Sequence, residues 1–313
     1  MREPPLDLPG EALRAAVQAQ YGLAVAELGF LPLGHDSSAW VYRVRSSDGA
    51  SYFLKVRRCM VNEPSLLVPR YLHDQGVARV IAPLSSTTRT LWVEVDGYAL
   101  ILFPFVEGTT GMEHGMAPSQ WIAFGAMLRQ VHAAPLPPDL ARRMRRETFA
   151  PEGAGLVREL EAHMGGQTFA DPAARTLATF WHERRDDIQR LVERAEELGR
   201  RLAQSAPRFV LCHADIHTAN VLLDAEGQVW IVDWDETVLA PKERDLMFVV
   251  GGGISDRLVG PCEEELALQG YGPTTLDPVA LTYYRYAWAV SDIGAYGAQV
   301  CLRPDLGQVT RHE

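Results

Sequence analysis

The spacing of apolar positions changes along this chain near residue 104. Before that point, residues 11–21 place Leu13, Ala16 and Val17 on one side of a helix, and Gly22 follows as a stop signal. A stripe of apolar residues at this spacing is typical of an amphipathic helix that covers a core. We therefore expect a helix near the beginning of the chain.

Short runs rich in β-branched and aromatic residues follow this helix. Two pairs of runs each enclose a turn signal: residues 40–44 and 52–56 flank Ser46-Ser47-Asp48-Gly49, and residues 91–95 and 98–103 flank Asp96-Gly97. Such turns favour antiparallel hairpins, because glycine accepts a positive φ. After Pro104 the pattern becomes helical, at residues 121–132, 173–202 and 278–300. The sequence therefore predicts an α+β chain of two lobes, β-rich over residues 1–104 and α-rich over residues 105–313.

Composition and charge narrow the class of protein. A hydrophobic fraction of 47% with 22% charged residues is ordinary for a soluble globular chain. No apolar run has the length of a membrane span, no signal peptide is visible, and the four cysteines lack metal-site spacing, so we expect a cytoplasmic protein that binds no membrane. The net charge of −10 argues against nucleic acid as a partner and favours the approach of a cationic small molecule.

The stretch His213-Ala214-Asp215-Ile216-His217-Thr218-Ala219-Asn220 carries the clearest chemistry. Asp215 and Asn220 have the spacing of the kinase catalytic loop, in which the aspartate accepts the acceptor's proton and the asparagine holds magnesium. A hairpin with its turn at residues 224–227 follows, and it is expected to fold Asp233 back beside Asn220. An amide oxygen and a carboxylate together suit Mg²⁺. Asp215 is thus the candidate catalytic residue, and Asn220 and Asp233 are the candidate metal ligands.

Several residues are candidates for binding the rest of a nucleotide. Lys55 lies inside a predicted strand, where a kinase places the lysine that contacts the α- and β-phosphates, and Glu63 is the nearest candidate for its carboxylate partner. Pro69 is expected to interrupt the helix that such a glutamate needs. The remaining candidates are the phosphate-loop residues Asp36, Ser37 and Ser38 and the linker residues Pro104, Phe105 and Val106, where adenine would dock on backbone groups.

Other polar and aromatic residues near the motifs have expected roles. Asp235 and Glu236 follow the metal aspartate closely enough to face an ammonium group of a substrate. His213 and His217 are expected to order the loop rather than react. Asp245 is expected to cap the helix that follows it. The late tyrosines, Tyr283 and Tyr284 among them, are expected in the core, and walling a sugar or aminocyclitol ring is the alternative.

Taken together, H-A-D-I-H-T-A-N, I-V-D-W-D-E and Lys55 resemble the aminoglycoside phosphotransferase family, whose loop is commonly H-G-D-x-H-x-x-N. The resemblance covers about Gly34 to Tyr296. Weaker strings, Val68-Pro69-Arg70-Tyr71-Leu72 and Tyr283-Tyr284-Arg285-Tyr286, look most similar to spectinomycin phosphotransferases. Ala214 departs from the family's frequent glycine.

The resemblance implies a protein-kinase-like fold, ATP and Mg²⁺ as cofactors, and transfer of the γ-phosphate to a hydroxyl of a small cationic acceptor. An aminoglycoside or aminocyclitol antibiotic such as spectinomycin is the first expectation. A metabolic kinase for choline, ethanolamine, homoserine or a methylthio-sugar is the alternative, and a non-catalytic ligand-binding protein is a further one. A protein kinase is disfavoured by the missing arginine and A-P-E segment. The sequence does not indicate an oligomeric state.

Overall fold

The computed structural model describes residues 3–5, 7–34, 38–58, 61–77, 79–165, 169–254 and 257–302. The chain forms two compact units. The first unit comprises Met1–Arg145, His213–Val238 and Gly253–Pro273; the second comprises Arg146–Cys212, Leu239–Gly252 and Thr274–Glu313. The predicted lobe boundary between residues 104 and 105 stays a prediction. The first unit contains residues from both sides of that boundary, because the catalytic hairpin belongs to it together with the N-terminal sheet.

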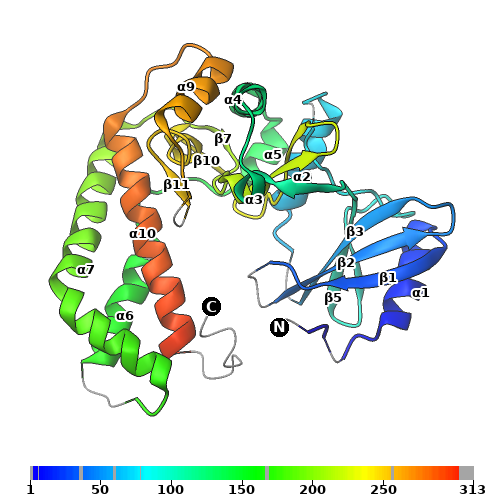
Figure 1. Ribbon diagram of the computed structural model, residues 1–313, viewed down its shortest axis with the longest axis horizontal. Coiled ribbons are helices and arrows are strands. Elements are labelled where there is room, and N and C mark those ends of the chain that lie inside the picture. Colours follow the sequence, from blue (N-terminus) through cyan, green and yellow to red (C-terminus); the bar gives the residue numbers. More distant parts are fainter. Residues whose placement is uncertain are drawn as a thin grey trace. The chain divides into compact units, whose positions relative to one another are not determined.

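The first unit is built on a five-stranded sheet in the order β1-β2-β3-β5-β4 (Figure 1). All neighbouring strands are antiparallel, and they comprise β1 (Val25–Leu31), β2 (Ala39–Ser46), β3 (Ser51–Arg58), β4 (Val93–Val95) and β5 (Tyr98–Pro104). Leu13 and Val17 of helix α1 (Gly10–Tyr21) pack with Val44, Leu54 and Leu100 in one core. The predicted helix and both predicted hairpins are confirmed.

Helix α2 (Pro64–Asp74) follows β3 and runs through Pro69. The expected interruption at Pro69 is wrong. A proline inside a helix removes one backbone hydrogen bond. Here burial of Leu66, Val68 and Leu72 offsets that loss, because each of these side chains is at most 3% exposed.

The predicted catalytic hairpin belongs to the same unit. Strands β8 (Val221–Asp224) and β9 (Val229–Ile231) pair antiparallel, and β6 (Gly108–Thr110) adds a third strand beside β8. The turn between them uses Gly227 at φ 74°. A short 3₁₀ turn, η1 (Thr218–Asn220), leads into β8. Strand β8 thus connects the catalytic loop, which precedes it, with β6, which follows the five-stranded sheet in the chain.

Helices α3 (Gly111–His114), α4 (Pro118–Ala133), α5 (Pro138–Arg143) and α9 (Pro261–Tyr271) complete the described helices of the first unit, with a small ribbon of β11 (Gly253–Ile254) and β12 (Arg257–Leu258). Helices α4 and α9 approach at backbone distance. A Cβ on Gly125 would lie 1.9 Å from the carbonyl oxygen of Ala267. Glycine is therefore required there by the close packing of two helices.

The second unit is mainly helical. Helices α6 (Ala154–Met164), α7 (Pro172–Ser205) and α10 (Pro278–Cys301) share one core, and α7 and α10 lie side by side in Figure 1. Strand β7 (Val210–Cys212) pairs with β10 (Val238–Ala240), and the short helix α8 (Glu243–Leu246) follows. Among the described residues, no helix is both long and apolar enough to cross a membrane.

Candidate active site

The catalytic loop is held from within by His213. Its Nδ1 accepts the N–H of Asp215 at 3.3 Å, and its Nε2 lies 2.8 Å from the carbonyl oxygen of Val232. Because Nδ1 accepts, Nε2 carries the proton and donates it to Val232. The fully buried ring also lies 4.7 Å from that of Trp234. His213 therefore ties the start of the loop to the residue that precedes Asp233.

Two residues of the site have a left-handed backbone. Ala214 has φ 71° and Asp233 has φ 61°. Such a conformation costs a non-glycine residue roughly 1–2 kcal/mol, although aspartate tolerates it better than most. Glycine would adopt the backbone conformation of Ala214 without this cost.

Asp215 is positioned by Asn220. The Nδ2 of Asn220 donates to the carbonyl oxygen of Asp215 at 2.7 Å and to its Oδ2 at 3.0 Å. The other oxygen, Oδ1, is buried and accepts no hydrogen bond from any described residue, with His217 Nε2 3.2 Å away. The Asp215 side chain as a whole is 23% exposed, so a carboxylate held in this way is placed to accept a hydrogen bond from a substrate hydroxyl.

Asn220 and Asp233 are brought together by the hairpin, as predicted. The N–H of Val232 donates to the carbonyl oxygen of Asn220 at 3.1 Å, so Asp233 follows directly beside it. The amide nitrogen of Asn220 is engaged with Asp215, which leaves its Oδ1 as a ligand atom. The Asp233 carboxylate is 49% exposed. One amide oxygen and one accessible carboxylate fit a Mg²⁺ ion that keeps several waters.

Lys55 reaches the same place from strand β3. Its Nζ lies 2.7 Å from Oδ2 of Asp235 and 3.5 Å from Oδ1 of Asp233, and its side chain is 17% exposed. Burial alone would lower the pKa of Lys55, but the carboxylates of Asp233 and Asp235 outweigh it and the pKa is raised. The ammonium group therefore stays charged beside the candidate metal ligands.

Three predicted residues lie elsewhere than expected. Glu63 forms an ion pair with Arg143 and not with Lys55. Asp235 binds Lys55 and Arg57, and Glu236 binds Arg145 at 2.9 Å, so both carboxylates already face cations of the chain rather than an open acceptor site. Sequence spacing could not show this, because each of the four cationic partners lies far along the chain from its carboxylate.

The phosphate loop is described only in part, since Asp36 and Ser37 lie outside the described residues. The carbonyl oxygen of Ser38 accepts the N–H of Arg58 at 2.8 Å, which joins the loop to β3. In the linker, Pro104 has no N–H, and the N–H of Phe105 donates to Ser51 at 3.3 Å. Within the described chain the N–H of Val106 makes no hydrogen bond, which leaves it as the linker's donor for a base.

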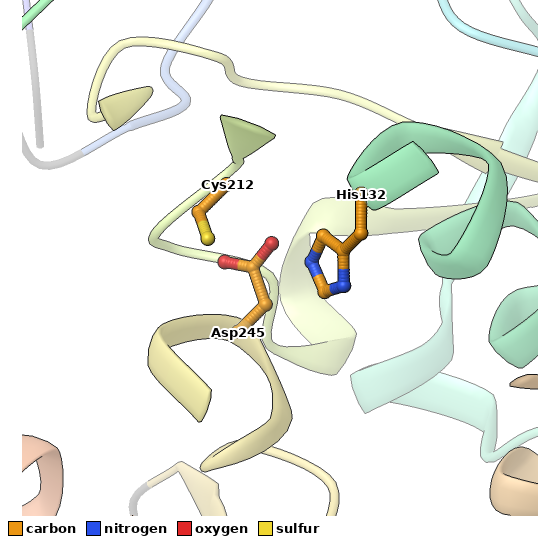
Figure 2. Close-up of side chains that lie close together, drawn as sticks. All are labelled: His132, Cys212 and Asp245. Carbon is orange, nitrogen blue, oxygen red and sulfur yellow. The ribbon is translucent and has the colours of Figure 1, made fainter. Parts of the chain in front are cut away.

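Residues of the second unit bear on two other expectations. Tyr283 and Tyr284 are 1% and 2% exposed, as expected of core residues. Asp245 does not cap a following helix. It lies inside α8, fully buried, with its carboxylate facing the thiol of Cys212 (Figure 2). Burial, together with the charge of Asp245, raises the pKa of that thiol.

Comparison with known proteins agrees with the fold. Residues 29–280 match the phosphotransferase enzyme family. Protein StrN of Streptomyces griseus is 29% identical over 286 residues, which are 87% of this chain and 79% of StrN. Spectinomycin phosphotransferase APH(9)-Ia, solved with ADP and spectinomycin, is 31% identical with a TM-score of 0.86 over 96% of this chain and 90% of its own. Choline kinase LicA from Streptococcus pneumoniae shares the fold alone, at 14% identity and a TM-score of 0.56 over 94% of this chain and 97% of its own.

The chain belongs to the phosphotransferase enzyme family and has its kinase-like fold. It is a phosphotransferase with a hydroxyl group as acceptor, similar to enzymes that act on antibiotics. The resemblance drawn from the two motifs and Lys55 is confirmed, and so is the expected fold class.

Proposed function

We propose that this enzyme transfers the γ-phosphate of MgATP to a hydroxyl of a small cationic aminocyclitol or aminoglycoside, with spectinomycin as the first candidate. The observation that carries the reaction is the Asp215 carboxylate, which Asn220 fixes through Oδ2 and which stays 23% exposed. The similarity to spectinomycin phosphotransferase, at 31% identity, supports the acceptor.

Each site residue has a role in this proposal. Asp215 orients the acceptor hydroxyl and accepts its proton. Asn220 and Asp233 hold Mg²⁺, which neutralises charge on the donor phosphates when it is bound. Lys55 binds the α- and β-phosphates. Ser38 with Asp36 and Ser37 would cover the phosphates, and Val106 would bind the adenine next to Pro104 and Phe105.

The acceptor is proposed as a cation, and a cation is recognised by any carboxylate-lined site. The chain's net charge of −10 favours a cationic acceptor through long-range attraction. The same charge suits choline or homoserine, so metabolic acceptors are the alternative. We place the enzyme in the cytoplasm, where ATP is available, with no nucleic acid or membrane as partner.

A panel assay tests the proposal. ADP release from MgATP would be measured with spectinomycin, other aminoglycosides, choline, ethanolamine and homoserine, with the Asp215→Asn protein as the control for contaminating activity. Spectinomycin should stimulate ADP release and yield a phosphorylated product by mass spectrometry. Stimulation by choline or homoserine alone would reject the antibiotic acceptor and keep the phosphotransferase. ATP binding without transfer to any acceptor would favour a non-catalytic binding protein.

A further inference from the structure

Lys55 has a carboxylate partner from an unexpected part of the chain. Kinases normally pair this strand lysine with a glutamate of the following helix. Here the glutamate at the start of α2, Glu63, binds Arg143, and Asp235 lies 2.7 Å from the Lys55 ammonium. Asp235 comes two residues after the candidate metal ligand Asp233. The lysine and the metal site are therefore connected through one short segment.

A second cation of β3 shares the same carboxylate oxygen. Side chains two residues apart on a strand point to the same face, so Arg57 lies beside Lys55. Its guanidinium is 3.1 Å from Oδ2 of Asp235. Both cations are largely buried, with exposed fractions of 17% and 20%, so their attraction to Asp235 is weakly screened.

The backbone of Asp235 is also held, by the segment between β3 and α2. The Nδ2 of Asn62, just before α2, donates to the carbonyl oxygen of Asp235 at 3.1 Å. Asp235 is thus fixed at its side chain by β3 and at its backbone by the segment that enters α2. Restraint at both the side chain and the backbone is typical of a structural carboxylate rather than of one that binds a substrate.

We infer that Asp235 anchors Lys55 for nucleotide binding and that Arg57 is a positioning residue that holds Asp235 in place. The inference rests on the proposed use of ATP. Because Arg57 takes part of the charge of Asp235, Lys55 is oriented without being fully neutralised. With MgATP bound, Asp233 would hold Mg²⁺ and Lys55 would contact the phosphates, while Arg57 would keep Asp235 beside the lysine.

A double-mutant cycle on ATP binding tests this role. Calorimetry would measure the Kd of ATP, with and without Mg²⁺, for wild type, Asp235→Asn, Arg57→Met and the double variant. Each single change should weaken binding by roughly tenfold, the size of a typical coupled contact. In the Asp235→Asn background, Arg57→Met should have no further effect, because Arg57 acts through Asp235. The loss at Asp235 should persist without Mg²⁺, because Lys55 and not the metal carries it.

Two further variants of β3 serve as controls for this test. Arg58 is the next residue of β3, points to the opposite face and binds Asp7 and Tyr98, so Arg58→Met should leave ATP affinity unchanged. Arg57→Lys should restore most of the affinity that Arg57→Met loses. If the Asp235→Asn protein does not fold, the comparison of Arg57→Lys with Arg57→Met still decides.

If the wild-type protein binds ATP, three outcomes would overturn this inference and leave the proposed function standing. They are an unchanged affinity in Arg57→Met, equal losses from that change in both backgrounds, and a loss at Asp235 that disappears without Mg²⁺. The last outcome would make Asp235 a metal ligand. A wild-type protein that binds no ATP would overturn the proposed function, and this inference with it.

Discussion

At the scale of single residues, the site depends on how each carboxylate is engaged. Asp215 is fixed by an amide, that of Asn220, whereas Asp235 and Glu236 are paired with cations of the chain. Three acidic residues that look alike in the sequence therefore differ in what they are able to bind. The first two predictions use this difference.

Asp215→Asn should lower kcat by about a hundredfold to ten-thousandfold, the usual contribution of a general base. Its affinity for MgATP should stay close to that of wild type, because the role proposed for Asp215 is toward the acceptor. Steady-state kinetics and calorimetry measure the two quantities separately. Asp224→Asn, at the turn of the same hairpin where Asp224 binds Trp230, is the matched control and should keep its turnover. Near wild-type turnover in Asp215→Asn would remove the assignment.

Asp233→Ala should weaken binding of MgATP by roughly tenfold or more, since even residues that only support a metal ligand contribute ten- to hundredfold. Binding of ATP without Mg²⁺ should change much less. Titration of ATP against the variant at several Mg²⁺ concentrations gives both values. Should the variant bind MgATP as tightly as wild type, Asp233 is not a metal ligand.

At the scale of elements, the hairpin β8–β9 and the packing of helices give the site its support. The hairpin joins Asn220 to Asp233 through the bond between Val232 and Asn220. Helices α4 and α9 lie so close that glycine is needed at their contact. Helix α2 shows the opposite case, because burial there overrides the local effect of Pro69.

Gly125→Ala should destabilise the protein by about 1–3 kcal/mol or more, because its Cβ would lie 1.9 Å from the carbonyl oxygen of Ala267. Gly155→Ala is the matched control. That glycine also lies in a helix, α6, but its Cβ would meet nothing within 4 Å, so the change should be neutral or stabilise by up to about 1 kcal/mol. Equilibrium unfolding in urea compares the two. Equal stabilities would show that α4 and α9 do not pack as described.

At the scale of the whole molecule, buried groups that must keep their protons set the alkaline limit of stability. Burial raises the pKa of Tyr21 to about 12, and it raises the pKa of Tyr283, Tyr284 and the Cys212 thiol. In an unfolded chain cysteine ionises near 8.5 and tyrosine near 10. The fold binds these protons more tightly, so their contribution is complete below about pH 8.5 and is lost as the pH rises.

The free energy of unfolding should therefore decline above about pH 8.5 and more steeply above about 10. Urea unfolding between pH 7 and 11, with ultraviolet absorbance of tyrosinate, measures both effects. Tyr21→Phe keeps the ring but removes the hydroxyl that donates to Leu100 at 3.0 Å, so its stability should decline less steeply at high pH. Stability that rises between pH 9 and 11 would contradict the raised pKa values.

The sequence by itself determined what depends on short stretches of chain. Asp215, Asn220 and Asp233 lie within one loop and one hairpin, and local turn chemistry brings them together, so their spacing predicted their arrangement. The helix and hairpins of residues 11–103 followed from periodicity for the same reason. The family could be recognised from these local motifs.

Only the tertiary structure decided which distant charges meet. Lys55 and Asp235 are 180 positions apart, and Glu63 and Arg143 are 80 apart, so no local pattern indicates either pair. Which carboxylate each cation meets depends on the register of β3 in the sheet and on the position of helix α2, which continues through Pro69. It also depends on which of several nearby carboxylates each cation binds. The strength of an ion pair depends on the distance between the two charges and on their burial in the folded chain. Spacing along the sequence gives neither quantity.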